Sequence, residues 1–403
     1  MQRPIDIICA GHFDLDIIPR FITTQRYSAI NEFLIPGKMV EAGEAAVVPG
    51  GPVTNTGLSL HRLGVSVELM GKVGTDTFGK SLMGLIEEYE PHHRFRGFKV
   101  VDGIDTSYVI AIILPGIERI YVVNPGAGNT FGMDDINWDI AAQSKIFHIG
   151  YPPWLRKTYF NDGEELLAIF KRMKELGVTT SVDMSLPEEG TEAGMQDWEK
   201  ILRRWAPWCD IMVPSVEETL YFLDRPKYNK MRSALGPNEH LLDHLTPADI
   251  VPLGERLIEF GVKTAMIKCG HFGLYICTAE KDRVREMGAA TPRDLDNWHR
   301  RQLWHPVYYV PGDEMVGSLG SGDSAIAGFF AAFIKNRSIE DCLRYANAAG
   351  SRNVTVSDGL SWNKGFEDLT RRIEEGWESE PFEISEKGWK RDRELWVGPA
   401  DSA

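Results

Sequence analysis

The sequence has little of what marks secreted, membrane-spanning or nucleic-acid-binding proteins. Its five cysteines are odd in number and scattered, and no pair has metal-ligand or redox spacing, so we expect reduced thiols and no disulfide framework. No apolar run approaches the roughly 20 residues that a membrane helix needs. Positive charge is in deficit, with 44 Lys and Arg against 58 Asp and Glu. The net charge of −14 argues against nucleic acid or an anionic membrane as the main partner.

Further absences narrow the location and the fold. The first residues lead directly into an apolar strand pattern at Ile5–Ala10 and leave no room for a signal peptide, so we expect a cytoplasmic protein. No Gly-x-Gly-x-x-Gly follows that strand, which argues against a dinucleotide-binding oxidoreductase. We find no internal repeats or low-complexity tracts. The 403 residues, 43% of them hydrophobic, suffice for one large domain or two modest ones.

What the sequence does contain is an alternation of short apolar runs and helical patterns. The runs at 146–150, 179–183 and 211–213 are separated by helical patterns such as 164–176. This alternation predicts βαβ units and a parallel sheet. We therefore expect the α/β class.

Two segments interrupt that alternation and predict a small separate sheet. Residues 20–49 show weak, broken alternation typical of short antiparallel strands, and residues 106–123 predict two strands around Pro115-Gly116. We expect these segments to form a β lid from about 13–49 and 104–128. Arg119 lies on the second turn and could meet a substrate anion, but an exposed hairpin charge is the favoured interpretation.

A glycine-rich turn runs straight into an apolar helix near residue 320. Gly320, Ser321 and Gly322 precede Asp323, and the apolar residues that follow recur on one helical face: Ile326, Phe329, Phe330, Phe333 and Ile334. The first turn of a helix has unpaired N–H donors and a partial positive charge, so it suits a phosphate or a developing negative charge. Asp323 then either faces a ligand group that must lose a proton, or it is the N-cap of the helix.

Polar residues also follow the first strand and open the first helix. Asp14 and Asp16 are two residues apart, so in an extended chain both side chains point the same way and could converge on one ligand, although an exposed strand face is the alternative. Gly50 and Gly51 lie at a strand-to-helix turn, where glycine permits close backbone approach. Asn55 offers both a donor and an acceptor, as a sugar hydroxyl requires, or it caps the helix.

These segments resemble two signatures of the ribokinase-like (PfkB-type) carbohydrate kinases. Gly-Ser-Gly-Asp-Ser-Ala-x-Ala-Gly-Phe at 320–329 is similar to the C-terminal signature, and Gly-Gly-x-x-x-Asn with Gly-x-Val-Gly-x-Asp-x-x-Gly over 50–79 is similar to the N-terminal one. The resemblance implies that Asp323 is the catalytic base beside an anion hole, and that Asp16 binds sugar hydroxyls. We assign Asp76 and Gly79 to capping and turns.

The resemblance also implies a nucleotide and a metal. Ser215-Val216-Glu217-Glu218 is similar to the family's Asn-x-x-Glu motif, so Glu218 would help to hold hydrated Mg²⁺, although these residues also spell a capping box. Lys268, Gly270 and Gly273 lie in a hairpin similar to one that borders the ATP phosphates, and a solvated lysine is the alternative for Lys268. Asn347 lies where members of the family often have an Asn or His that faces the adenine.

Three stretches depart from the family pattern. Gly317 replaces the first Asp of the C-terminal signature, which in many relatives helps to bind potassium, so we predict little activation by that ion. The segment 283–309 is unusually long, and we expect a flap near the nucleotide. The region 361–403 is acidic, contains four tryptophans, and should pack on its own domain or on a neighbouring subunit.

Together these patterns predict a three-layer α/β/α, Rossmann-like (ribokinase-like) domain over 1–360, with a β-sheet lid and an extension over 361–403. The predicted function is ATP-dependent phosphorylation of a hydroxyl on a sugar or sugar-like molecule, with ATP and Mg²⁺ as cofactors. A nucleoside or vitamin-precursor kinase of the same fold, or a degenerate homologue that only binds a metabolite, are the alternatives. A homodimer could form through the lid or the extension.

Overall fold

The structure is a computed structural model that describes residues 3–117, 119–236 and 239–402. The predicted ranges 1–360, 104–128 and 361–403 each include positions outside these residues. The strands are β1 (Ile5–Gly11), β2 (Asp14–Phe21), β3 (Ala42–Gly50), β4 (Val67–Met70), β5 (Lys72–Gly74), β6 (Lys99–Val101), β7 (Tyr108–Ile112), β8 (Ile120–Asn124), β9 (Ser144–Gly150), β10 (Thr179–Asp183), β11 (Ile211–Met212), β12 (Thr264–Lys268), β13 (Leu274–Thr278), β14 (Gln302–His305), β15 (Lys390–Asp392) and β16 (Leu395–Val397). The helices are α1 (Gly51–Arg62), α2 (Thr77–Tyr89), α3 (Trp138–Ala141), α4 (Arg156–Glu175, broken at 160–163), α5 (Trp198–Trp205), α6 (Val216–Leu223), α7 (Arg225–Ala234), α8 (Pro247–Phe260), α9 (Lys281–Arg285), α10 (Ser321–Ile334), α11 (Ile339–Asn353) and α12 (Phe366–Glu374).

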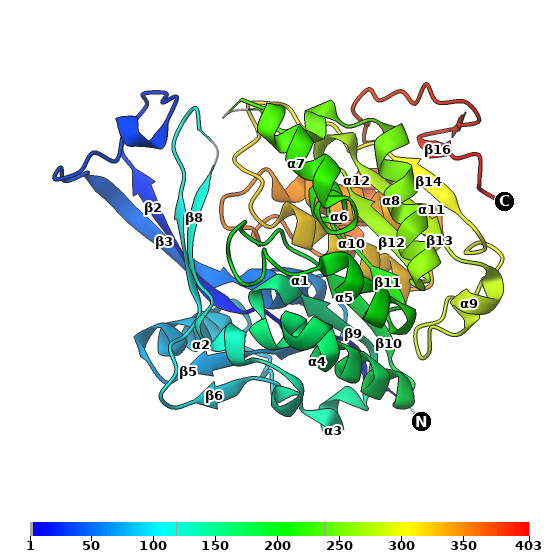
Figure 1. Cartoon of the computed structure of the whole chain (residues 1–403), viewed down its shortest axis with the longest axis horizontal. Coiled ribbons are helices and arrows are strands. Elements are labelled where there is room, and N and C mark those ends of the chain that lie inside the picture. The colour runs from blue at the N-terminus through cyan, green and yellow to red at the C-terminus, as the bar shows by residue number, and fades with distance from the viewer. Residues whose placement is uncertain (1–2, 118, 237–238, 403) are drawn as a thin grey trace.

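A central sheet organises the molecule, with helices on both faces (Figure 1). Its strand order is β15-β16-β14-β13-β12-β11-β10-β9-β1-β4. The strands from β4 to β12 in this order pair in parallel, and those from β13 to β15 pair antiparallel. The predicted parallel α/β sheet is therefore confirmed, and so is the three-layer architecture.

Each face of the sheet carries its own hydrophobic core. Successive residues of β1 show the division, because Ile8 and Ala10 belong to one core and Ile7 and Cys9 to the other. Helices α4, α5, α6 and α8 cover the first face, and α1, α2, α10, α11 and α12 cover the second. Both faces are buried, which explains why the parallel strands read as short continuous apolar runs.

Helix α10 is the most deeply buried of the covering helices. Its residues from Asp323 to Phe333 are all buried, so it is apolar on every side and not only on the predicted face. Gly328 allows α11 to pack directly against it, because a Cβ there would lie 2.2 Å from the carbonyl oxygen of Tyr345. This packing fixes the position of the amino end of α10, where the glycine-rich turn lies.

The lid is a second sheet with the order β3-β2-β7-β8, and in Figure 1 its strands extend away from the layered body. The predicted lid is confirmed, with one difference in its first segment. We expected several short strands over residues 20–49, whereas two long strands, β2 and β3, flank an irregular loop over 22–41 that has only a short helical turn. Because β2 starts at Asp14, the two predicted acceptor carboxylates lie on the lid itself.

The region after residue 360 packs on the same body. Trp362 is buried in one core, and Trp396 is buried in the other. Strand β16 pairs with β14 and so extends the central sheet, and β15 forms its edge. Of the two alternatives for this region, packing on its own domain is therefore what the structure shows.

Over residues 283–301 the prediction of a nucleotide-side flap is wrong, whereas His305 and Pro306 near the end of the segment lie beside Asn347, on the predicted nucleotide side. The segment after α9 lies at the amino end of β10, because the Ala289 amide donates to Gly177 O (3.0 Å) and the Ala290 amide to Thr179 Oγ1 (2.9 Å). It then supplies β14 to the central sheet. In the part of the chain that the structure describes, no helix is long and apolar enough to cross a bilayer.

Candidate active site

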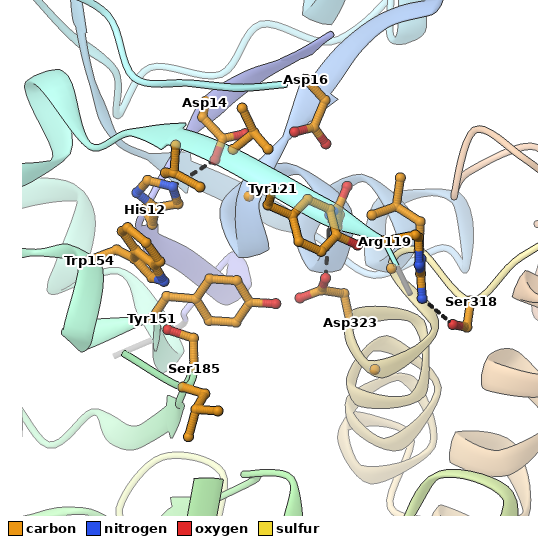
Figure 2. Close-up of a pocket in the computed structure, with 18 residues that line it drawn as sticks. His12, Asp14, Asp16, Arg119, Tyr121, Tyr151, Trp154, Ser185, Ser318 and Asp323 are labelled. Carbon is orange, nitrogen blue, oxygen red and sulfur yellow. Dashed lines mark hydrogen bonds and ion pairs between the residues drawn. The ribbon is translucent and has the colours of Figure 1, made fainter. Parts of the chain in front are cut away.

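A cavity of about 390 Å³ lies between the lid and the amino end of α10 (Figure 2). The chain reaches it from the ends of β1 and β9, from the lid strands and from the glycine-rich turn. Such a position, at the carboxyl ends of parallel strands, is where doubly wound folds bind ligands. The lining residues are His12, Asp14, Asp16, Gly51, Asn55, Val109, Arg119, Tyr121, Val123, Tyr151, Trp154, Ser185, Leu186, Ser318, Leu319, Gly320, Gly322 and Asp323.

Asp323 lies at the floor of this cavity and is 4% exposed. Its two oxygens accept hydrogen bonds from Asn55 Nδ2 (3.3 Å) and Thr56 Oγ1 (3.2 Å), both on α1. Helix α10 begins at Ser321 with Gly320 as its N-cap, so the alternative that Asp323 is the N-cap is wrong. Its carboxylate faces the cavity in Figure 2.

The surroundings of Asp323 make it a stronger base than an exposed aspartate. Burial raises the pKa of its carboxyl above the ordinary value. The Lys268 ammonium and the hydrogen bonds from Asn55 and Thr56 act in the opposite direction, because they favour the charged form. A carboxylate held in place by two donors, with a raised pKa, can accept a proton from a neighbouring hydroxyl.

The predicted anion hole is the turn that opens α10. Gly320 adopts the left-handed conformation (φ 72°), which lets the chain turn sharply into the helix. In this structure the Ser321 amide donates to Ser318 O (3.2 Å), and no side chain caps the helix. The positive pole of a 14-residue helix therefore lies at this turn, beside the cavity.

The two predicted acceptor carboxylates, Asp14 and Asp16, lie on one side of β2 and both line the cavity. Gly50 is required there, because a Cβ would come within 2.1 Å of Asp14 Oδ1 and 2.5 Å of Asp16 Cγ. Burial raises the pKa of Asp16 well above its ordinary value, and the negative charges of Asp14 and Asp323 add to this effect. The carboxylates are thus crowded and short of compensating charge.

His12 is the side-chain partner of one of these carboxylates. Its Nε2 lies 2.6 Å from Asp14 Oδ2, and both side chains are buried. Asp14 Oδ1 has no hydrogen-bond partner within the described chain, although it is buried and belongs to a cavity-lining residue. A buried carboxylate oxygen without a donor is costly, so it is well suited to accept a hydroxyl of a bound ligand.

Beside the amino end of α10, a buried ion pair joins two strand ends. Lys268, the last residue of β12, lies 2.6 Å from Asp183, the last residue of β10. The lysine side chain passes beside the predicted anion hole, because a Cβ on Gly322 would lie 3.6 Å from its Cδ. Burial disfavours the charged form, but Asp183 and the nearby acidic groups outweigh it and raise the pKa of Lys268.

The capping box at the start of α6 is confirmed. The Ser215 amide donates to Glu218 Oε2 (2.7 Å), and the Glu218 amide donates to Ser215 Oγ (3.3 Å). Glu218 lies near Lys268, and burial raises the pKa of its carboxyl. The capping contact uses Oε2 and leaves the other carboxylate oxygen of Glu218 for a further partner. A role for Glu218 in metal binding is therefore compatible with the capping box and stays a prediction.

The remaining nucleotide-side residues lie outside the cavity. Gly270 belongs to the turn between β12 and β13, and Gly273 (φ 93°) packs against β14, where a Cβ would lie 2.0 Å from His305 O. Asn347 is 4% exposed and donates from Nδ2 to His305 O (3.0 Å) and Pro306 O (3.2 Å). In this structure its amide nitrogen holds the turn after β14, and an adenine contact stays a prediction.

The structure brings seven predicted residues together in the cavity, and several others line it that we did not predict. The seven are Asp14, Asp16, Gly51, Asn55, Gly320, Gly322 and Asp323. Arg119 is half-buried in the cavity wall, so its interpretation as an exposed hairpin charge is wrong. The available signal was its alternation with Tyr121 and Val123, which share one strand face.

Tyr151 was missed because its signal is conformational. It follows β9 directly and has a left-handed backbone (φ 58°), which is uncommon for a tyrosine and costs energy. In Figure 2 its ring points toward Asp323 from the strand end, beside Trp154 and Ser185. No sequence pattern predicts that conformation.

Comparison with known proteins gives consistent results. The model of the pfkB family carbohydrate kinases matches residues 22–362. An uncharacterised sugar kinase of Archaeoglobus fulgidus is 25% identical over 307 residues, which cover 74% of this chain and 94% of that protein. The Arabidopsis thaliana ribokinase complexed with ribose and ATP has a TM-score of 0.63 and 18% identity, covering 92% of this chain and 98% of its own. A protein described as a ribokinase II from E. coli, in complex with ATP and Mg²⁺, has a TM-score of 0.64 and 17% identity, covering 92% and 99%. These structural likenesses establish a shared fold.

Proposed function

The chain belongs to the pfkB family of carbohydrate kinases, and we propose from this premise that it transfers the γ-phosphoryl group of ATP to a hydroxyl of a sugar-like acceptor. Asp323 is the proposed general base, and the amides of residues 320–323 are the proposed anion hole. One observation carries the proposal. A buried carboxylate with a raised pKa lies at the positive end of a helix, inside a cavity with two further carboxylates suited to hydroxyls.

The proposed reaction is an in-line displacement. The acceptor oxygen forms a bond to the γ-phosphorus while the bond from that phosphorus to the β–γ bridging oxygen breaks, and ADP leaves with the electron pair. A carboxylate oxygen of Asp323 accepts the proton that leaves the acceptor hydroxyl as the new bond to phosphorus forms. Most of the rate enhancement in such a reaction comes from positioning and charge stabilisation, so a carboxylate base of moderate strength is sufficient.

Acceptor binding is proposed at the lid end of the cavity. Asp16 and the unpartnered Asp14 Oδ1 would accept hydrogen bonds from hydroxyls, and Asn55 would orient the reacting hydroxyl because it already donates to Asp323. Gly51 leaves room for the backbone to approach, since a Cβ there would lie 2.7 Å from His12 O. This arrangement fits a compact polyhydroxylated molecule.

Nucleotide binding is proposed beside the anion hole, toward β12. Lys268 keeps its charge and lies next to Gly322, so it is placed to meet a phosphate, and Gly270, Gly273 and Asn347 are the further candidates. Structural neighbours include complexes with ATP, and one with ATP and Mg²⁺. Magnesium is usually held by one or two carboxylates together with phosphates and water, so Glu218 suits the role of neutralising phosphate charge through the ion.

The decisive experiment is an ATP-consumption screen of the full chain against neutral sugars, sugar acids, nucleosides and vitamin-precursor alcohols. Mass spectrometry of the phosphorylated product would identify the acceptor, and Asp323→Asn serves as the matched inactive control. A sugar hit that the control variant does not phosphorylate supports the proposal. If only nucleosides were phosphorylated, the proposed sugar-like acceptor would be wrong and the protein would be a nucleoside kinase. Acceptor binding without any ATP turnover would favour the degenerate metabolite-binding homologue.

A further inference from the structure

Tyr151 presents a hydroxyl to the cavity, and this group has no part in the proposed proton transfer. The residue directly follows β9, is half-buried and belongs to the cavity lining. Figure 2 shows its ring extending from the strand end, with the hydroxyl pointing toward the Asp323 carboxylate. Among the residues that the structure describes, none is hydrogen-bonded to this hydroxyl. Its proton and its lone pairs are therefore available to a bound group.

The backbone of Tyr151 is held in a conformation that tyrosine rarely adopts. Its φ of 58° and ψ of 55° are left-handed, a region in which a bulky residue is strained. Two hydrogen bonds maintain it, because the Tyr151 amide donates to Asp183 O (3.0 Å) and the Trp154 amide donates to Tyr151 O (2.9 Å). Strained residues persist where the surrounding structure fixes them, and they cluster at active sites. This backbone fixes the point from which the ring enters the cavity.

The strand register places Tyr151 between the two halves of the proposed site. Gly150, the last residue of β9, pairs with Gly11 at the end of β1 and with Asp183 at the end of β10. The chain after β1 leads to the proposed acceptor carboxylates on β2, whereas Asp183 holds Lys268 on the proposed nucleotide side (2.6 Å). The residue that follows Gly150 therefore lies where an acceptor and the end of a nucleotide would meet.

Negative charge surrounds the hydroxyl and keeps it neutral. Burial raises the pKa of Tyr151 well above its ordinary value. The effect on this pKa is increased by four nearby carboxylates, those of Asp323, Asp183, Glu218 and Asp14. The phenol therefore retains its proton through the physiological pH range, and it is a hydrogen-bond donor instead of a base. A donor at this place strengthens the binding of an anionic group, which the surrounding carboxylates would otherwise repel.

We infer that Tyr151 is a further catalytic residue, whose hydroxyl donates a hydrogen bond to an oxygen of the transferring phosphoryl group. This inference rests on the proposed function. During the transfer, charge is spread over the three equatorial oxygens of that group, so each donor that reaches one of them lowers the barrier. The proposed amide donors come from α10, and this donor comes from the end of β9. Tyr151 keeps its proton throughout, because Asp323 accepts the one proton that the reaction releases.

Two other roles of Tyr151 would give different kinetic results. If its hydroxyl donated to Asp323 instead, it would be a positioning residue that lowers the pKa of the base, and its loss would move the acid limb of the rate–pH profile to higher pH. If only the ring mattered, as a wall for the acceptor, loss of the hydroxyl would change neither kcat nor the profile. A donor that acts on the phosphoryl group in the transition state affects kcat and leaves both the profile and KM in place.

The kinetic test uses the full chain with the acceptor found in the screen. Tyr151→Phe keeps the ring and removes the donor, so kcat should fall roughly 10²-fold, the scale of one lost donor to a transition-state charge. KM for ATP and KM for the acceptor should each change less than about threefold. Tyr159→Phe is the matched control, because Tyr159 lies further along the same segment, in a core and outside the cavity lining. Unchanged kcat in Tyr151→Phe, or a loss that disappears at higher pH, would overturn the inference.

A binding test needs neither turnover nor an acceptor. Calorimetry in the presence of Mg²⁺ would compare ADP alone with ADP plus aluminium fluoride, which mimics the transferring phosphoryl group. We expect wild type to bind ADP more tightly when the fluoride is present, and Tyr151→Phe to lose most of that gain while binding ADP alone normally. A gain that survives in Tyr151→Phe, or the absence of a gain in both proteins, would overturn the inference. Failure of the proposed function is separate, because it would appear as full activity in Asp323→Asn.

Discussion

The two ends of the central sheet each bury a lysine–aspartate pair, but they treat charge in opposite ways. At the amino end, Asp210 just before β11 meets two lysines: Lys174 Nζ at 2.7 Å and Lys263 Nζ at 3.2 Å. Its carboxylate also accepts from the Thr180 amide (2.8 Å). One buried negative charge thus has two cations and a backbone donor. We interpret the role of Asp210 as structural, because it holds α4, β10 and the residue before β12 together.

At the carboxyl end the balance is reversed. Lys268 is paired with Asp183, and it also lies within the influence of Glu218 and Asp323. Asp183 Oδ2 and Asp14 Oδ1 are buried without a hydrogen-bond partner within the described chain. An end of a sheet that keeps unpaired oxygens and raised carboxyl pKa values is less stable than it could be. Such sites are characteristic of places where function opposes stability.

The strongest test of this comparison is a pair of aspartate substitutions, one at each end. Asp323→Asn should lower kcat by two or more orders of magnitude, the scale of general-base losses, because the amide cannot accept the hydroxyl proton. Its melting temperature should not fall, since an ionisable group with an unfavourable buried charge has been removed. Steady-state kinetics and thermal unfolding give the two values. Acceptor binding, measured by calorimetry, should persist, and equal activity in mutant and wild type would remove the kinase assignment of this residue.

Asp210→Asn should give the converse result. The substitution leaves Lys174 and Lys263 buried without a negative partner, so the free energy of unfolding should fall by about 3–5 kcal/mol. Urea unfolding measures it, and kcat of the folded enzyme should stay near wild type. Glu175→Gln, which breaks the exposed pair with Arg172, is the control and should cost at most about 1 kcal/mol. An equal effect of both substitutions would contradict the structural role of Asp210.

A smaller effect is expected from the acceptor carboxylate. Asp16→Ala removes a charged hydrogen-bond acceptor, and such bonds contribute roughly 1.5–3 kcal/mol, so KM for the acceptor should rise at least about tenfold. KM for ATP should remain nearly unchanged, because the proposed nucleotide side is built from β12, α6 and α10. Initial rates at varied concentrations of each substrate separate the two constants. If ATP binding were weakened and the acceptor spared, the two halves of the site would be assigned the wrong way round.

The raised pKa of Asp16 also predicts how stability changes with pH. Burial, together with Asp14 and Asp323, makes the folded state hold this proton more tightly than the unfolded chain does, where aspartate titrates near about 3.9. The favourable contribution is therefore complete below that pH and is lost as the pH rises through the folded pKa. Asp16→Asn should match wild type in stability near pH 4 and exceed it at pH 8. Urea unfolding at both values tests this, and a gain confined to pH 4 would show that the sign is wrong.

The smallest expected effect concerns potassium. Gly317 donates its amide to Val354 O (3.2 Å), and a Cβ there would meet nothing within 4 Å, so no carboxylate exists at this position and the space beside it is open. Neutral carbonyl oxygens bind a monovalent cation weakly, so replacing sodium by potassium at fixed ionic strength should change kcat by less than about twofold. Steep, saturable activation would show a cation site after all. Loss of that activation in Asp313→Asn would then locate the compensating carboxylate.

Much of the fold could be predicted because its signals are local. Thr179–Asp183 is a strand at the predicted residues, and Asp76 caps α2 by accepting from the Gly79 amide (2.8 Å). The glycine-rich turn before α10 was equally readable, since only small residues allow that geometry. These features depend on neighbours within a few positions in the sequence.

What escaped prediction depends on contacts between distant segments. The pairing of His12 with Asp14, the position of Arg119 against Ser318, and the left-handed Tyr151 follow from how the lid meets the core. The segment after α9 was misplaced for the same reason, because its polar composition did not reveal which end of the sheet it joins. Composition indicates exposure, but the sheet topology decides where an exposed segment lies.

The pairing of β16 with β14 has a consequence for the order of folding. Strand β14 borders β13 on one side, and on its other side it pairs with β16, about 90 residues further along the chain. Until that segment docks, β14 presents a row of unpaired backbone groups, which invites pairing with another chain. Closing so long a loop is slow, so a partly folded species with an open edge should accumulate during refolding. Chaperone dependence and yield on expression should therefore be sensitive to changes around Trp396, although this residue is remote from the cavity.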